Sequence, residues 1–188
     1  MHIYQALYYY ILKPKEAIKK SINFEYSLVI YLTASLSTAI SVLYSSGHKS
    51  NILSLIVLSF SIALYTAVSS IGKIAIIHLT ASIFIKNIDK KNITAFINNC
   101  FGISGIFILI LPITLIFSVF SSIFFIQVSA LLIIHLYYII LLYNNIKYSL
   151  NIESSFKAFL ILIAPVIYDY IVNISLAVLI FGVLINYI

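Results

Sequence analysis

Lys73 and Asp169 are the charged residues with the least usual positions in this sequence, because each interrupts a long apolar stretch. Lys73 lies 22 residues beyond Asn51, and Asp169 lies 19 residues before the last residue. An unpaired charge in apolar surroundings costs a few kcal/mol, so two such charges at similar depth favour pairing. One hypothesis is an intramembrane ion pair between Lys73 and Asp169 near the cytoplasmic boundary. The alternative is that each side chain reaches the lipid headgroups separately.

Ser104 lies in a short motif that offers a nucleophile. Residues 102–105, Gly-Ile-Ser-Gly, fit the G-x-S-G pattern of rhomboid-type intramembrane serine proteases. Such an enzyme needs a histidine on a neighbouring helix to activate the serine Oγ, and His78 or His135 could supply it. His135 has no flanking glycine to allow close helix approach, and about five spans are fewer than that architecture uses. We therefore expect helix packing and no enzyme activity, with the protease as a remote alternative.

The histidines and the cysteine offer no ready metal or cofactor site. Neither His78 nor His135 has a second histidine or a carboxylate four residues later, as a metal pair on one helix face would need. Cys100 is the only cysteine, so neither an intrachain disulfide nor a cysteine-based metal cluster can form. We expect neutral histidines hydrogen-bonded within the bundle, with a proton relay as the functional alternative, and no catalytic, metal-binding or cofactor-binding residue.

The composition is typical of a protein embedded in lipid. Only 9% of the residues are charged, whereas a soluble domain has about 25%, because its surface must face water. The net charge of +6 comes from lysines that cluster between apolar stretches, where they orient helices in a membrane. This distribution excludes nucleic acid as a partner. We expect the lipid bilayer as the main partner, together with other membrane proteins or a second copy of this chain.

The apolar stretches predict an all-α polytopic transmembrane helical bundle of about five spans. The expected spans are residues 26–44, a stretch over residues 51–85, residues 95–120, residues 124–142 and a stretch over residues 156–188. The second stretch would be about 50 Å long, well beyond a roughly 30 Å hydrocarbon core. It must therefore tilt, bend or leave the membrane. We expect the span to end near Lys73, with residues 74–85 interfacial or packed under the bundle, and a continuation of the same helix is the alternative. We expect the last stretch to break near Pro165 and Asp169.

Prolines and small residues predict how these helices bend and pack. Pro112 and Pro165 should kink their helices, because proline removes a backbone hydrogen bond. Small residues on one helix face let two backbones approach closely. The expected packing face consists of Thr33, Ser37, Ser41, Gly102 and Gly105. A polar permeation pathway is the functional alternative for the hydroxyl side chains, although no intramembrane ring of carboxylates supports it.

The chain divides into an N-terminal segment, residues 1–24, and a five-span domain, residues 25–188. From Pro14 onward, apolar residues alternate with lysines as in an amphipathic helix that lies at the membrane surface, and Pro14 suits its first turn. A frayed basic tail is the alternative. Five spans with a cytoplasmic N-terminus place nine lysines in cytoplasmic segments and only Lys49 on the opposite side, a strong positive-inside bias. We expect a multi-pass plasma or inner membrane protein with its C-terminus on the opposite side.

Several segments together resemble the Yip1 family of small multispanning membrane proteins. They are residues 11–17 with Pro14, residues 77–93 at the end of the second stretch, residues 110–112 with Pro112, and residues 136–165, which include Tyr137-Tyr138 and Pro165. This chain departs from the family at Lys86-Asn87 and at Asn144-Asn145, where glycines are common. The resemblance implies a five-span bundle with a cytoplasmic N-terminus. It also implies a role in membrane trafficking or membrane organisation.

Two functions of different classes follow for this chain. The first is a non-enzymatic scaffold of Yip1 type, which should have a filled bundle and an exposed lateral or cytoplasmic face. The second is a small transporter or a transporter membrane subunit. A transporter should have a polar, ligand-sized cavity near the midplane of the membrane, often beside a broken helix.

Overall fold

The computed structural model of the protein describes residues 2–20, 22–45, 51–85, 89–118 and 124–185, with only the backbone of residues 124–127 and 176–185. These residues form helices and no strand. The elements are α1 (Ile3–Leu12), α2 (Pro14–Lys20), α3 (Phe24–Ser45), α4 (Ile52–Phe84), α5 (Lys90–Ile103), the 3₁₀ helix η1 (Ser104–Leu109), α6 (Ile110–Ser118), α7 (Phe124–Ser149) and α8 (Ser155–Ile185). Residues 119–120, the end of the predicted third span, lie outside the described residues.

Five segments are long and apolar enough to cross a membrane, as the sequence predicted. They are Phe24–Ser45, Ile52–Phe84, Lys90–Ser118, Val128–Ser149 and Ser155–Ser175. The third segment is not one α-helix, since it consists of α5, η1 and α6 in succession. The chain is therefore a polytopic, all-α membrane protein.

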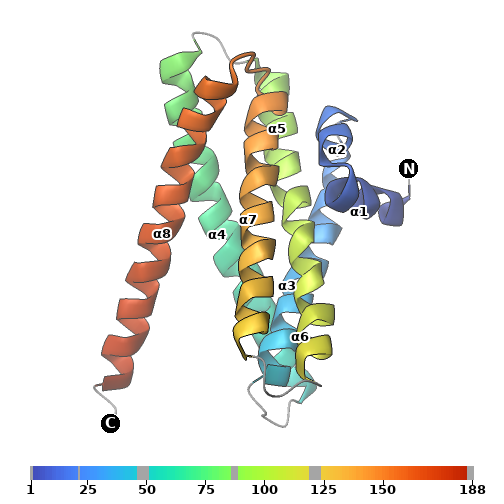
Figure 1. Ribbon diagram of the computed structural model, residues 1–188, viewed down its shortest axis with the longest axis vertical. Coiled ribbons are helices and arrows are strands. Elements are labelled where there is room, and N and C mark those ends of the chain that lie inside the picture. The colour runs from blue at the N-terminus through green and yellow to red at the C-terminus, as the bar shows by residue number, and fades with distance from the viewer. Residues whose placement is uncertain (1, 21, 46–50, 86–88, 119–123, 186–188) are drawn as a thin grey trace.

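The spans form a bundle that α4 crosses obliquely (Figure 1). At one end of α4 lie the lower parts of α3 and α6, and at its other end lies the start of α8. Both α3 and α8 pack extensively against α4, and α7 packs between α8 and α5. The tilt of α4 lets a helix of 33 residues fit a bundle whose α3 has 22.

Two predicted helix breaks are wrong. We expected the second span to end near Lys73, yet α4 continues as one helix to Phe84. We also expected a break near Pro165 and Asp169, yet α8 runs through both residues and buries Pro165 completely. A charge inside an apolar stretch was interpreted as a membrane boundary, whereas here each charge lies within a continuous helix and has a partner.

The fourth span also extends further than predicted, because two asparagines continue the helix. We expected α7 to end at Leu142, but it continues to Ser149, with Asn144 and Asn145 buried. The Asn145 amide donates a hydrogen bond to the Phe96 carbonyl at 3.1 Å, and its Oδ1 accepts one from Ser149 at 2.6 Å. These partners satisfy an amide that would otherwise favour a loop.

The third span departs from α-helical geometry just before Pro112. The sequence predicted a kink at this proline, in the same span. The change is the 3₁₀ helix η1, and Pro112 lies in the first turn of α6. Because proline has no backbone N–H, the carbonyl four residues earlier, at Ile108, loses its usual partner. The Ser37 hydroxyl of α3 donates to this carbonyl at 2.9 Å and accepts from the Leu111 N–H at 3.3 Å. Ser37 therefore closes a gap in another helix.

Most of the predicted packing residues lie at helix contacts. Gly102 and Gly105 are buried, and a Cβ at Gly102 would lie 2.0 Å from the Tyr10 ring. A Cβ at Gly105 would lie 2.5 Å from the Ile30 side chain. Ser37 and Ser41 are buried as well. Thr33 is exposed and donates to the Val29 carbonyl of its own helix, so its assignment to the packing face is wrong.

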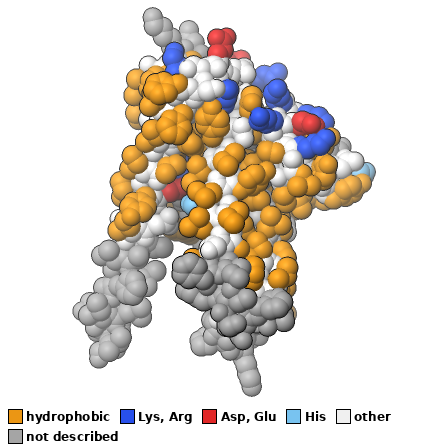
Figure 2. Space-filling model, in the orientation of Figure 1, with side chains coloured by type: hydrophobic (Ala, Val, Ile, Leu, Met, Phe, Trp, Pro, Cys, Tyr) orange, Lys and Arg blue, Asp and Glu red, His pale blue; other side chains and the backbone are white. Residues whose placement is uncertain are grey.

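The N-terminal segment forms two helices instead of one, and Tyr10 attaches them to the bundle. In Figure 1, α1 lies across the direction of the spans, and Figure 2 shows lysines gathered at this end of the molecule. The buried Tyr10 hydroxyl donates to Asn99 Oδ1 at 2.9 Å and lies 3.1 Å from Ser27 Oγ. Burial raises the pKa of Tyr10 to about 12, so this phenol keeps its proton at neutral pH.

Replacing Ser37 tests whether its hydroxyl stabilises the interrupted third span. Ser37→Ala leaves the Ile108 carbonyl unpaired in a buried site, which we expect to cost about 1–3 kcal/mol. Thr33→Ala on the exposed face of the same helix is the control and should change stability by less than about 0.5 kcal/mol. Reversible unfolding in mixed micelles measures both. Equal stability of the two variants would contradict the role given to Ser37.

Candidate functional site

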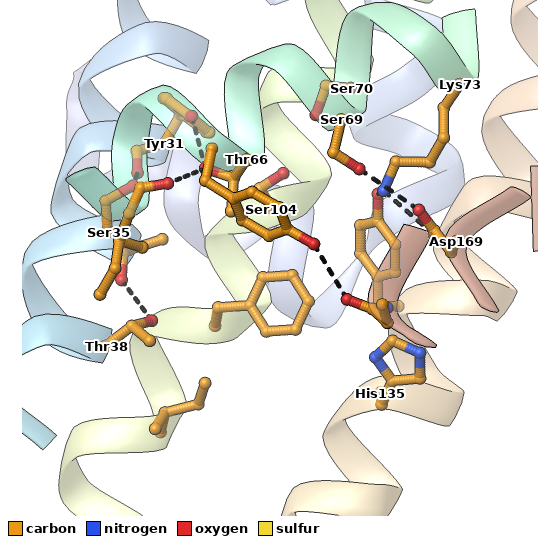
Figure 3. A pocket seen from close by; sticks show the side chains of 17 residues that line it. Tyr31, Ser35, Thr38, Thr66, Ser69, Ser70, Lys73, Ser104, His135 and Asp169 are labelled. Carbon is orange, nitrogen blue, oxygen red and sulfur yellow. Dashed lines mark hydrogen bonds and ion pairs between the residues drawn. The ribbon is translucent and has the colours of Figure 1, made fainter. Parts of the chain in front are cut away.

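A pocket of about 240 Å³, with mainly apolar walls and several polar side chains, lies among α3, α4, η1, α7 and α8 (Figure 3). We call it the central pocket. Its polar lining includes Ser35 and Thr38 from α3, Ser70 and Lys73 from α4, Ser104 from η1, His135 from α7, and Asp169 and Asn173 from α8. An apolar bundle gains nothing from such a lining unless the polar groups bind one another, water or a ligand.

Lys73 and Asp169, which the sequence analysis paired, form an ion pair in the wall of this pocket. The Lys73 Nζ lies 3.2 Å from Asp169 Oδ2, and the side chains are 12% and 19% exposed. Lys73 also donates to the Tyr138 hydroxyl at 3.2 Å, and Ser69 donates to Asp169 Oδ1 at 3.4 Å. Each charge therefore has a charged and a neutral partner, which offsets much of the cost of removing it from water.

The depth of the ion pair differs from the prediction. We expected it near the cytoplasmic boundary, but its partner Tyr138 lies in the middle of the span Val128–Ser149. The α3 residues of the same pocket, Ala34 and Ser35, lie in the middle of the span Phe24–Ser45. The pair is therefore near the midplane of the bundle. The prediction placed it too shallow because it counted residues as if α4 ended at Lys73.

A close approach of α4 and α8 holds the two charged residues together. Gly72 precedes Lys73, and a Cβ at Gly72 would lie 2.2 Å from the Tyr168 hydroxyl of α8. A larger residue at position 72 would displace the Tyr168 side chain, which lies next to Asp169 in the sequence. Gly72 was a signal that sequence reasoning missed, because a lone glycine in a long apolar stretch has no obvious partner.

The serine and threonine hydroxyls of the pocket present mainly acceptor atoms. Ser35, Thr38 and Ser104 each donate their proton to the backbone carbonyl four residues earlier, at distances of 2.9 to 3.2 Å. A hydroxyl oxygen that has donated its proton still carries lone pairs that can accept a hydrogen bond. These side chains therefore suit a ligand with N–H or O–H groups, or ordered water.

Two polar side chains of the pocket lack partners within the described part of the chain. Ser70 is buried and lines the pocket, yet its hydroxyl forms no hydrogen bond there. The His135 ring lies 6.2 Å from the Tyr138 ring and makes no hydrogen bond, although we expected one. Groups of this kind are free to bind a molecule that enters the pocket.

The geometry required of a protease does not occur among the described residues. Ser104 and His135 line the same pocket, but the Ser104 proton is donated to the Cys100 carbonyl at 3.2 Å and not to a histidine. His78 lines a separate cavity together with Phe96. Within the described ranges, no group of three or more His, Cys, Asp or Glu residues could hold a metal ion.

Several lining residues were not predicted, because their neighbours lie far away in the sequence. The Tyr31 hydroxyl binds Thr66 Oγ1 at 2.6 Å and also donates to the Ala63 carbonyl, which joins α3 to α4. The Tyr65 hydroxyl donates to Asn173 Oδ1 at 3.0 Å and joins α4 to α8. Tyrosines are so abundant in this chain that no single one was informative.

Comparison with family models, with curated proteins and with solved structures finds no match to this chain. The assignment of a function therefore depends on the geometry of the central pocket, and membership of the Yip1 family stays a proposal.

A double-mutant cycle tests the energetic role of the ion pair. Lys73→Met or Asp169→Leu alone leaves one charge without its counter-ion, which we expect to cost about 3 kcal/mol of unfolding free energy. The double variant removes both charges and should recover most of this loss. Lys157→Met, which removes an exposed lysine of α8, is the control and should have little effect. If the two single losses simply add in the double variant, the charges do not stabilise each other.

Proposed function

We propose that this protein is a small transporter or a transporter membrane subunit that holds its substrate in the central pocket. The observation that carries the proposal is the pocket itself. It sets polar side chains among apolar walls, lies near the midplane, contains the Lys73–Asp169 pair and borders the interrupted helix at Ser104. Transporters commonly place substrate sites near the midplane and beside helices that depart from regular α-geometry.

The scaffold of Yip1 type is the second candidate. It would need a filled bundle, and the central pocket argues against this. One observation favours the scaffold, namely the long apolar surface of α4. Only 6% of the most apolar part of this helix is buried within the protein. A partner helix could cover that face, but lipid covers such a face equally well. The pocket has no comparable explanation in a scaffold, so we rank the transporter first.

The size and lining of the pocket define what it can bind. A volume of about 240 Å³ is just below the usual range for small-molecule sites, so a small substrate or one group of a larger substrate would fit. Ser70 and His135 supply hydrogen-bonding groups without partners in the described residues, and Phe107 and Tyr138 supply aromatic walls. Polar groups among apolar walls are the usual composition of a ligand site.

Filling the pocket tests this function. Wild type is screened in micelles against acetate, ethylammonium, glycine betaine and lysophosphatidylcholine, and the unfolding temperature is measured. We expect at least one probe to raise it by about 5 °C near saturation. Ser70→Leu occupies the pocket and should abolish that shift. Ser61→Leu, the same change on the exposed face of α4, should preserve it.

Two results of this screen would contradict the proposed function. The first is that no probe changes the unfolding temperature of the wild type. The second is that Ser70→Leu and wild type respond equally to every probe, since binding would then occur outside the central pocket.

We propose that the N-terminus is cytoplasmic and that the C-terminus lies on the opposite side, because of the lysine distribution. Cys100 is buried, so an introduced cysteine reports its own location. In intact cells, a membrane-impermeant maleimide should label Asn51→Cys at once and Lys15→Cys only after permeabilisation. The reverse pattern would invert the proposed orientation.

A further inference from the structure

A second cavity, of about 290 Å³, extends the central pocket sideways. We call it the seam cavity, because α7 and α8 alone line it. It shares His135, Tyr138, Asp169 and Asn173 with the central pocket. Two cavities that share four wall residues are adjoining spaces, and the shared residues include one member of the ion pair.

The seam cavity lies next to the lipid-facing surface of the bundle. Its wall residues Ile167 and Tyr170 are 53% and 70% exposed, although both lie near the middle of the apolar helix α8. Figure 2 shows an acidic and a histidine side chain visible from outside among apolar ones, on the face where Figure 1 shows α7 and α8. A polar site near the midplane is thus reached from the side, through a gap with apolar edges.

The two charges restrict the charge of a ligand. Lys73 and Asp169 together are neutral, and their atoms lie 3.2 Å apart. A ligand with one charge would have to bind one residue beside the like-charged other, which costs free energy at low dielectric. A ligand with one positive and one negative group can bind both residues. The Lys73 ammonium already lies 5.1 Å from the centroid of the Tyr138 ring, so the cationic group of such a ligand would bind on the Asp169 side of the pair.

We infer that the substrate is a single-chain amphiphile with a zwitterionic head, which enters from the bilayer between α7 and α8. The head occupies the central pocket, and the chain lies in the seam cavity along Leu142 and Val166. The seam cavity, of about 290 Å³ between two helices, is at the small end of ligand sites, so it suits one hydrocarbon chain better than two. This inference rests on the proposed function and names its substrate class.

Three probes separate the head from the chain. They are lysophosphatidylcholine with a 14-carbon chain, glycerophosphocholine, which has the same head without the chain, and lysophosphatidylglycerol with the same chain and a net negative head. Each is added to the full-length protein in maltoside micelles, and the unfolding temperature is measured. We expect lysophosphatidylcholine to raise it by about 5 °C and each of the other probes by less than about 2 °C.

Val166→Phe tests the route. Val166 lines the seam cavity and not the central pocket, so the larger ring should narrow the seam and reduce the lysophosphatidylcholine shift at least twofold. Ile163→Phe, on the same helix and outside both cavities, is the matched control and should keep the full shift. Both variants must unfold cooperatively without a probe, and Val166→Leu is the smaller substitute if Val166→Phe does not.

The outcomes distinguish this inference from the proposed function. If glycerophosphocholine stabilises as well as lysophosphatidylcholine, and Val166→Phe has no effect, the ligand does not use the seam and only this inference fails. If lysophosphatidylglycerol stabilises equally, the zwitterionic head is wrong. If no probe of this set or of the wider screen gives a shift that Ser70→Leu abolishes, the proposed function fails as well.

Discussion

The Lys73–Asp169 ion pair is the interaction on which the interior of this bundle depends. Neither charge is near water at the end of a span, so each needs a counter-charge within the protein. The pair joins α4 to α8, and the hydrogen bond from Lys73 brings in Tyr138 of α7. Because two charged side chains and their donors do not pack like aliphatic ones, the same interaction leaves a polar space at the centre of the molecule.

Polar groups elsewhere in the bundle follow the same requirement. Ser37 pairs with the backbone that Pro112 leaves unsatisfied, and Asn99 and Asn145 bind partners on neighbouring helices. In lipid, no water is present to form a hydrogen bond with an unpaired polar group. Each of these bonds therefore helps to define which helices pack together. Within the described residues, Ser59 of α4 has no such bond, and neither do Ser70 and His135, which line the central pocket.

The helical class and the five spans could be predicted because hydropathy records the contact of each segment with lipid. The pairing of Lys73 with Asp169 could be predicted because buried charges require partners. Helix ends could not be predicted where polar residues have distant partners. The sequence predicts that the fourth span ends before Asn145, because the partner of this residue, Phe96, lies 49 positions away in the chain. The pocket was not predicted either. Its lining residues Tyr31, Thr66 and Asn173 come from three different helices and lie around one space only after the helices pack.

The 3₁₀ helix η1 has a geometrical consequence for the wall of the pocket. A 3₁₀ helix rises about 2.0 Å per residue with three residues per turn, against about 1.5 Å and 3.6 residues for an α-helix. Over the six residues of η1, the two forms differ by about 3 Å in length and by about a third of a turn. A conversion of η1 between the 3₁₀ and the α form would shift α6 along its axis and rotate it about that axis. Ser104 and Phe107 would then change their orientation toward the pocket that they line.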